Sequence, residues 1–246
     1  MNNLTEITKL KTEAIVITPV KDSLDTVKLT IKAVSQAKGN FEYIIYNDYS
    51  KKETKSYLEE NQPILGYQLV HLEDVTTNPS PNYKTVLKLA RKIAMEASVP
   101  LIIIESDVII QKDTIEELLK LSRRLTKPGL IGSITTDVNG QYNFPYGSEK
   151  KLNKGIAETR RSLSFCCTLL TSEFMKGYDF SELSQKKDWF DIYISRQSRK
   201  SGFKNYLIRR LPVVHLPHSS RPWKQLKYTH PVRYYFYKLI KKRDRI

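Results

Sequence analysis

Features of a small secreted domain are scarce in this chain. Only two of its 246 residues are cysteine, and Cys166 and Cys167 are adjacent within an apolar run. Adjacent cysteines cannot form a disulfide framework that ties distant segments together. Residues 1–13 hold no apolar core behind a basic cap, so we expect no secretory signal. The sequence therefore indicates a cytoplasmic protein.

Long hydrophobic runs are also missing. No window approaches the roughly 18 uncharged apolar residues that a membrane-spanning helix needs. Hydrophobic residues make up 40% of the chain and charged residues 27%, which excludes wholesale disorder and a collagen-like repeat. We expect an ordinary globular unit.

Acidic residues are nearly absent from the last fifth of the chain. Residues 196–246 contain 15 lysines and arginines and one acid, Asp244, whereas the whole chain has a net charge of +15. This local excess points to a polyanion or an anionic membrane surface as partner. A solvated, lysine-rich tail is the alternative.

Apolar runs typical of strands alternate with segments of helical periodicity. We predict strands at residues 14–18, 43–46, 69–72, 101–104, 130–135 and 163–170. We predict helices over 24–34, 50–60, 83–97 and 113–125, and a further helix leading on from residue 188. Two of them open with apparent capping boxes, Ser50 with Glu53 and Asp113 with Glu116. The alternation predicts an α/β fold with a mostly parallel sheet.

The Gly-, Asn- and Pro-containing stretch at residues 137–155 is long for a simple connection. It is either a mobile functional loop or contains a small hairpin.

Polar clusters follow the predicted strands at the edge where ligands bind in such sheets. Three come directly after strands: Thr18-Pro19-Val20-Lys21-Asp22, Asn47-Asp48 and Glu105-Ser106-Asp107. A fourth, Asp188-Trp189-Phe190-Asp191, leads into a helix.

The pair Glu105 and Asp107 is the most informative. In an extended chain residues i and i+2 point the same way, so both carboxylates would face one spot. Two such oxygen ligands suit Mg²⁺ or Mn²⁺ shared with substrate phosphates. A strand that simply ends in a polar turn is the alternative. His215 follows the apolar Val213 and Val214. It would complete a metal site, contact a phosphate, or serve as a hydrogen-bonded structural histidine.

The succession of these segments resembles the family 2 glycosyltransferases, which have the GT-A fold. The resemblance rests on residues 15–22, 43–48, 90–94, 102–107 and 188–202. It implies a single GT-A domain over residues 1–229, with a mostly parallel, Rossmann-like sheet flanked by helices. The nucleotide-binding part would cover 13–136 and the acceptor and catalytic part 137–229. Residues 230–246 would form a basic, aromatic C-terminal tail.

The resemblance implies inverting transfer of a sugar from a nucleotide-diphosphate donor, most simply a UDP- or dTDP-sugar, assisted by Mg²⁺ or Mn²⁺. The donor would be bound by Thr18, Pro19, Val20, Asp22, Asn47, Asp48, Arg91, Glu105 and Ser106. The metal would be held by Asp107 with Glu105 and His215. The catalytic base would be Asp191 or else Asp188.

The acceptor implied is a saccharide or a lipid-linked saccharide, in cell-surface polysaccharide synthesis. The Gln-x-x-Arg-Trp signature of processive synthases is absent, which favours single additions. The enzyme would be cytoplasmic and peripheral at the inner face of the plasma membrane.

Two other functions stay open. A pI near 9.6 and fifteen tyrosines suggest a nucleic-acid-binding protein. No aromatic RNA-recognition signature or zinc spacing supports that reading, so we expect no nucleic-acid partner. The other alternative is a catalytically inactive scaffold of the same fold at a membrane surface.

The tail itself has helical periodicity, with Val232, Tyr235, Phe236 and Leu239 on one face. Six bases and one acid lie in the last fifteen residues. This composition is typical of a helix lying in a membrane interface. An ordinary closing helix packed on the sheet is the alternative.

Overall fold

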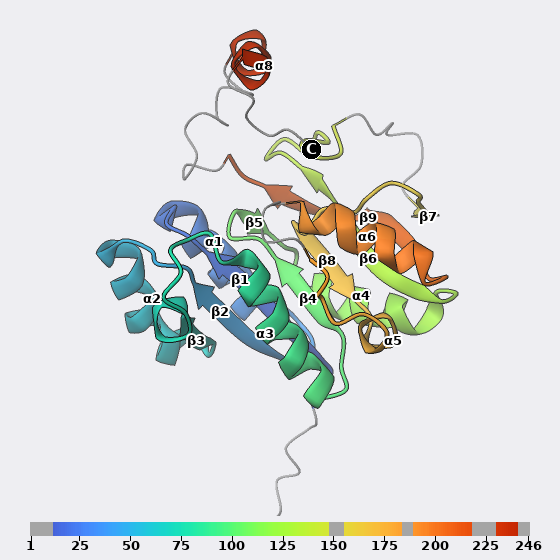
Figure 1. The fold of residues 1–246 in the computed structure, drawn as a ribbon, viewed down its shortest axis with the longest axis horizontal. Coiled ribbons are helices and arrows are strands. Elements are labelled where there is room, and N and C mark those ends of the chain that lie inside the picture. The colour runs from blue at the N-terminus through green and yellow to red at the C-terminus, as the bar shows by residue number, and fades with distance from the viewer. Residues whose placement is uncertain (1–11, 148–154, 184–188, 218–229, 241–246) are drawn as a thin grey trace, which may run out of the picture.

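The computed structural model describes residues 12–147, 155–183, 189–217 and 230–240. Within them a mixed sheet is flanked by helices (Figure 1). The strands are β1 (Ala14–Val20), β2 (Phe41–Asn47), β3 (Gln68–His71), β4 (Leu101–Ile104), β5 (Val108–Ile109), β6 (Pro128–Thr136), β7 (Ile156–Glu158), β8 (Cys167–Leu170) and β9 (Lys204–His215). The helices are α1 (Leu24–Ser35), α2 (Lys52–Leu65), α3 (Tyr83–Glu96), α4 (Thr114–Arg124), α5 (Ser172–Lys176), α6 (Phe190–Lys200) and α8 (Pro231–Ile240), with a 3-10 turn η1 at Leu72–Asp74.

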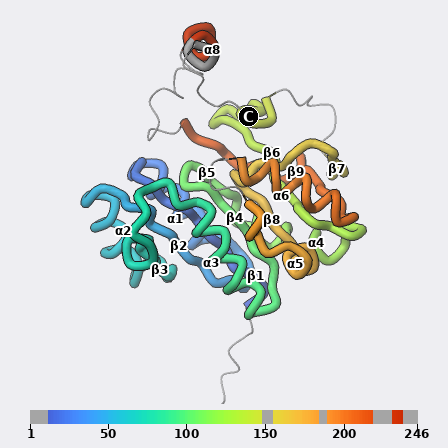
Figure 2. Tube along the Cα trace, viewed as in Figure 1, coloured from blue at the N-terminus to red at the C-terminus, as the bar shows by residue number. Residues whose placement is uncertain are grey.

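The sheet has a parallel half and a mixed half. Strands β3, β2, β1 and β4 lie side by side and parallel, as the strand–helix alternation predicts. Strand β8 then runs antiparallel between β4 and β6, and β6 is parallel to β9. Figure 2 shows the blue N-terminal strands on one side and the C-terminal strands on the other. The predicted α/β class is confirmed.

Both faces of the sheet are covered, which explains why its central strands β1 and β4 are almost entirely apolar. Residues Val16, Ile45 and Ile102 pack with apolar residues of α1, α2 and α4 on one face. Ile17 and Ile103 pack with residues of α3, α5 and α6 on the other. Because each strand contributes to both layers, β4 reads as an unbroken run of four buried residues.

The helix starts differ from the predicted capping boxes. Helix α2 begins at Lys52, and the Ser50 hydroxyl accepts a hydrogen bond from the Asp22 amide instead of capping it. Helix α4 follows Asp113, which makes no side-chain capping bond. Helix α2 also continues past residue 60 to Leu65. Local Ser/Asp–Glu spacing was therefore right about helices and wrong about their caps.

Two further predictions need adjustment. The strand expected at 163–170 is limited to β8, because the Ser164 hydroxyl accepts from the Cys166 amide and residues 165–166 turn. In the stretch at 137–155, Thr136 and Tyr142 form an antiparallel bridge, so the described part contains a small hairpin. Among the described residues, no helix has the length and apolarity needed to cross a membrane.

Candidate active site

Four ionisable side chains meet at the edge where the parallel strands end. Glu105 and Asp107 follow β4, His215 ends β9, and Asp191 lies in the first turn of α6. The charges of Asp107, Asp191 and His215 all act on the Glu105 carboxyl. These residues come from three separate parts of the chain, and the fold brings them to the same edge of the sheet.

The closest pair is Asp107 and His215. Strand β5 pairs antiparallel with β9 so that Val108 is opposite His215, and the Leu216 amide donates to the Asp107 carbonyl at 2.8 Å. This brings His215 Nε2 to 3.4 Å from Asp107 Oδ2, with both side chains nearly buried.

A backbone carbonyl orients the imidazole. His215 Nδ1 lies 2.9 Å from the carbonyl oxygen of Phe144, which can only accept, so Nδ1 carries the proton and Nε2 faces the carboxylate. The Asn143 amide nitrogen donates to the His215 carbonyl at 2.9 Å. Burial would lower the pKa of His215, but the bond to Asp107, its charge and the Phe144 carbonyl together raise it. Sequence reasoning missed Asn143 and Phe144, because only the hairpin brings them here.

The predicted geometry of Glu105 was wrong in one respect. Strand β4 ends at Ile104, and the Val108 amide donates to the Glu105 carbonyl at 3.1 Å, so Glu105, the buried Ser106 and Asp107 form a turn instead of extended chain. The carboxyl of Glu105 instead accepts from the Tyr83 hydroxyl at 2.6 Å. Burial, only partly offset by this bond, raises the Glu105 pKa to about 7.

Tyr83 joins three elements of the site. Its ring stacks on Phe165 and on Phe190, with centroids 6.5 Å and 6.0 Å apart. Phe190 immediately precedes Asp191, so one aromatic stack supports both Glu105 and the start of α6. Tyr83 was not predicted as a site residue, since its sequence signal is only its place at the start of a helix.

Asp191 is half-buried at the N-terminal turn of α6. Its Oδ1 accepts from the Ile192 amide at 2.8 Å. Burial raises the pKa of Asp191 to about 6, although backbone hydrogen bonds act in the other direction. The other candidate base, Asp188, lies outside the described residues.

The cluster predicted to follow the first strand lies mostly in the core, because β1 continues through Thr18 and Pro19 to Val20. The Thr18 hydroxyl accepts from the Tyr43 hydroxyl at 2.9 Å, and both Thr18 and Val20 are buried. Pro19 is half-buried. The side chains of Thr18 and Val20 thus belong to the core of the sheet, and the Val20 carbonyl accepts from the Asp48 amide at 2.8 Å.

Asp22 and Asn47 hold the loops after β1 and β2 together. Asp22 Oδ1 accepts from the Lys51 amide at 2.7 Å. Asn47 lies 2.9 Å from His71 Nδ1 through its amide nitrogen, and its oxygen accepts from the Ser50 amide. These bonds build the rim beside β1, β2 and β3.

Asp48 anchors the segment that leads into α3. Its carboxylate accepts from the Ser80 hydroxyl, the Asn82 amide and the Asn82 side chain, each at 2.8 Å. Asn82 directly precedes Tyr83 of the aromatic stack. Asp48 at the end of β2 therefore holds the start of α3, where Tyr83 donates to Glu105.

Arg91 plays a structural part. Its Nε donates to the carbonyls of Met175 and Tyr178 at 3.1 Å and 2.9 Å, tying α3 to the end of α5. These bonds give Arg91 a structural role, and its contact with a donor stays a prediction.

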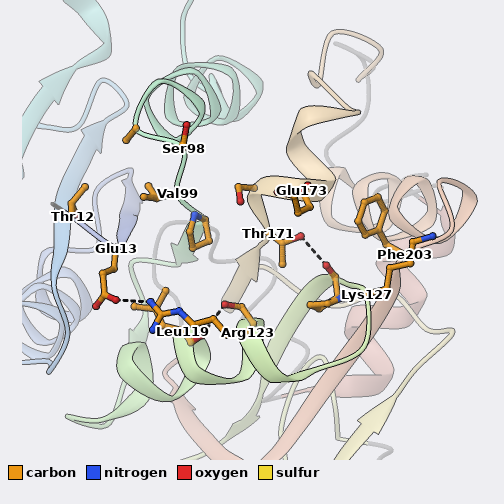
Figure 3. A pocket seen from close by; sticks show the side chains of 15 residues that line it. Thr12, Glu13, Ser98, Val99, Leu119, Arg123, Lys127, Thr171, Glu173 and Phe203 are labelled. Carbon is orange, nitrogen blue, oxygen red and sulfur yellow. Dashed lines mark hydrogen bonds and ion pairs between the residues drawn. The ribbon is translucent and has the colours of Figure 1, made fainter.

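An open pocket of about 550 Å³ lies at the opposite end of the sheet. Figure 3 shows its lining, which includes Glu13 just before β1, Val99 before β4 and Phe203 before β9. The Arg123 guanidinium there pairs with Glu13. The pocket therefore holds none of the four ionisable groups described above, and we place the candidate chemistry at the other edge.

Comparison with known proteins agrees with the fold. Residues 15–184 match the family model described as glycosyl transferase family 2. No curated protein sequence matches the chain significantly.

Three solved structures are similar to the chain. The crystal structure of S. aureus TarS 1-349 has a TM-score of 0.64 at 14% identity, over 83% of this chain and 60% of that one. GalNAc-T7 with UDP, GalNAc and Mn²⁺ has a TM-score of 0.61 at 13% identity, over 86% and 45%. The mannosyltransferase PcManGT from Pyrobaculum calidifontis, in complex with GDP-Man and Mn²⁺, has a TM-score of 0.60 at 13% identity, over 94% and 65%. The chain thus spans only about half to two thirds of their length, and at this identity the likeness shows the fold alone.

Proposed function

The chain belongs to glycosyltransferase family 2, and from that premise we propose that it transfers one sugar, with inversion, from a nucleotide-diphosphate sugar to a saccharide or lipid-linked acceptor. The acceptor would belong to cell-surface polysaccharide synthesis. The enzyme would work in the cytoplasm, peripheral to the inner face of the plasma membrane. The observation that carries the proposal is the meeting of Glu105, Asp107, Asp191 and His215 at the ligand edge of the sheet.

Asp191 is the proposed general base. Transfer to a sugar hydroxyl requires removal of its proton as the new bond forms, and one positioned carboxylate does this. With a pKa of about 6, Asp191 is ionised at neutral pH yet more basic than an ordinary aspartate. Such a base contributes roughly 10²–10⁴-fold to the rate.

A divalent metal fits the donor atoms around Asp107. With Nδ1 protonated, His215 Nε2 presents a lone pair toward Asp107 Oδ2 at 3.4 Å. Two facing lone pairs repel each other, and a proton or a cation between them removes that repulsion. Among the described residues no group of three or more acids, histidines or cysteines is arranged to hold a metal by itself. Asp107 and His215, with Glu105 nearby, would thus hold Mn²⁺ or Mg²⁺ shared with donor phosphates. When bound, the metal stabilises the negative charge of the departing diphosphate.

The donor nucleotide would lie along the rim made by Asp22, Asn47 and Asp48, with the backbone of residues 18–20 beneath it. Ser106 would lie toward the donor sugar. We propose a UDP- or dTDP-sugar as the donor. The similar structures of GalNAc-T7 with UDP and of PcManGT with GDP-Man support a nucleotide-linked donor in general.

Thermal unfolding with UDP, dTDP, GDP and CDP, each with and without Mn²⁺, tests the proposal. A nucleotide at 100 times its dissociation constant stabilises the fold by about 2.7 kcal/mol, which raises the midpoint by roughly 5–10 °C. Donor turnover is then followed as release of nucleoside diphosphate from the matching nucleotide sugar. Stabilisation by RNA alone would identify a nucleic-acid-binding protein. Nucleotide binding without turnover on any acceptor would identify an inactive scaffold.

A further inference from the structure

Helix α8 presents apolar and aromatic side chains to solvent. Val232, Tyr235 and Phe236 are 85%, 53% and 58% exposed, whereas Tyr234 is buried. Positions i, i+3 and i+4 share one side of a helix, so the three exposed residues form a single strip, here called the α8 face. Large apolar side chains gathered on one exposed helix face mark an interaction surface.

The sequence of α8 and of the residues that follow it is strongly basic. Arg233 and Lys238 belong to the helix, and Lys241, Lys242, Arg243 and Arg245 come after it in the sequence, against the single acid Asp244. The partner must therefore offer both an apolar interior and a negative surface. A bilayer containing anionic lipids offers both in one plane.

The position of α8 suits such a partner. Helix α8 lies beyond the edge at which the parallel strands end (Figure 1). His215, the last residue of β9, belongs to the candidate active site at that same edge. A bilayer that contacts α8 would thus face the end of the molecule where an acceptor enters.

We propose that the α8 face inserts into the interface of an anionic phospholipid bilayer and holds the active-site end of the protein against it. This proposal names the membrane surface that the proposed peripheral location requires, and it does not depend on the proposed sugar transfer. Two copies joined through the same face would bring two basic tails together, and this repulsion favours lipid over a second copy. A free polyanion would satisfy the charge but leave the apolar strip in water.

Co-sedimentation of the full chain with phosphatidylcholine vesicles, with and without phosphatidylglycerol, tests the proposal. We expect binding only to the anionic vesicles, weakened by salt. The exposed-face variant Val232→Ser/Tyr235→Ser/Phe236→Ser should lower the partition coefficient more than about tenfold. The variant Lys241→Gln/Lys242→Gln should lower it by about fivefold for each lysine removed.

Matched variants elsewhere serve as controls. Ile64→Ser removes an apolar side chain that is 75% exposed on α2, and Lys52→Gln/Lys88→Gln removes two exposed lysines from α2 and α3. Both should bind vesicles like the unmodified chain. Nucleotide-induced thermal stabilisation should be unchanged in every variant, so a failure of lipid binding stays separate from a failure of the transfer reaction.

Three outcomes would overturn the proposal. The first is equal binding to neutral and anionic vesicles, and the second is equal binding by the exposed-face variant and the Ile64→Ser control. The third is a dimer, detected by light scattering, that the exposed-face variant converts to a monomer, which would assign the α8 face to a second copy. RNA binding that requires the two lysines, without vesicle binding, would likewise replace the bilayer with a free polyanion.

Discussion

The Nε2 atom of His215 lies 3.4 Å from the Oδ2 atom of Asp107, although the two residues are far apart in the sequence. Pairing of β5 with β9 sets this distance, and the Phe144 carbonyl sets the orientation of the ring. Strand pairing and a backbone hydrogen bond thus hold both residues of the pair in place. Such preorganisation is what a shared metal site requires.

Asp107→Asn should remove the metal dependence of nucleotide binding. The substitution keeps the shape of the side chain but removes the anionic oxygen beside His215 Nε2. We expect Mn²⁺ to improve nucleotide affinity by more than about tenfold in the unmodified chain and not in the variant, measured by calorimetry. His215→Gln should share this behaviour, whereas the exposed control Asp113→Asn should not. Equal nucleotide affinity with and without Mn²⁺ in the unmodified chain would contradict the metal site.

Asp191→Asn should keep donor binding and slow transfer by at least about a hundredfold. The amide cannot accept the acceptor's proton, but it occupies the same space. Nucleotide-induced stabilisation and turnover, measured on one preparation, separate the two effects. If Asp188→Asn gives this result instead, the base is three residues earlier; if neither slows transfer, the base lies elsewhere.

The pH dependence of turnover should follow the ionisation of the Asp191 carboxyl. Because the base must be ionised and burial raises its pKa to about 6, the rate should fall about tenfold per pH unit below pH 6 and level off above it. A fall in rate that begins only near pH 4, the ordinary range of an aspartate, would contradict a base whose pKa is raised to about 6.

Glu105→Gln should stabilise the fold at high pH. A carboxyl whose pKa rises from 4.5 to about 7 on folding destabilises the ionised protein. This cost is absent below about pH 4.5 and complete above about pH 7. We expect the variant to gain roughly 1–3 kcal/mol in urea unfolding at pH 8 and nothing at pH 4. A loss of stability at pH 8 would show that Glu105 is favourably paired in its ionised form.

Tyr83→Phe should show whether the hydrogen bond to Glu105 matters for activity independently of the packing of the Tyr83 ring. The variant keeps the ring between Phe165 and Phe190 and loses only the hydroxyl that donates to Glu105. We expect donor turnover to fall, while near-UV circular dichroism stays the same. Tyr178→Phe removes a hydroxyl from the same core cluster and should leave turnover unchanged. Equal activity of the two variants would mean that the Tyr83 hydroxyl has no part in the site.

Much of the parallel half of the fold could be predicted from residue order. The strand at 101–104 and the helix from residue 83 were placed within a residue of their observed bounds, because their apolar spacing leaves little choice of buried face. The capping box at Asp113 makes no side-chain bond, and the one at Ser50 failed because an amide from another segment competes for its hydroxyl. The Asp22 amide takes the Ser50 hydroxyl, an interaction that no local pattern contains.

The sequence by itself determined the α/β class and predicted the edge of the sheet where the proposed chemistry lies, because helices alternate with strands, make the strands parallel and so gather the polar residues that follow them at one edge. Only the tertiary structure decided which side chains meet. Antiparallel β8 and the return of β9 bring His215 to Asp107, and α3 brings Tyr83 to Glu105. Long-range strand pairing and helix packing set these contacts, and neither leaves a signature in local residue spacing. In the same way, the side chains of Thr18 and Arg91, which sequence position predicts as donor contacts, make structural hydrogen bonds to Tyr43 and Tyr178.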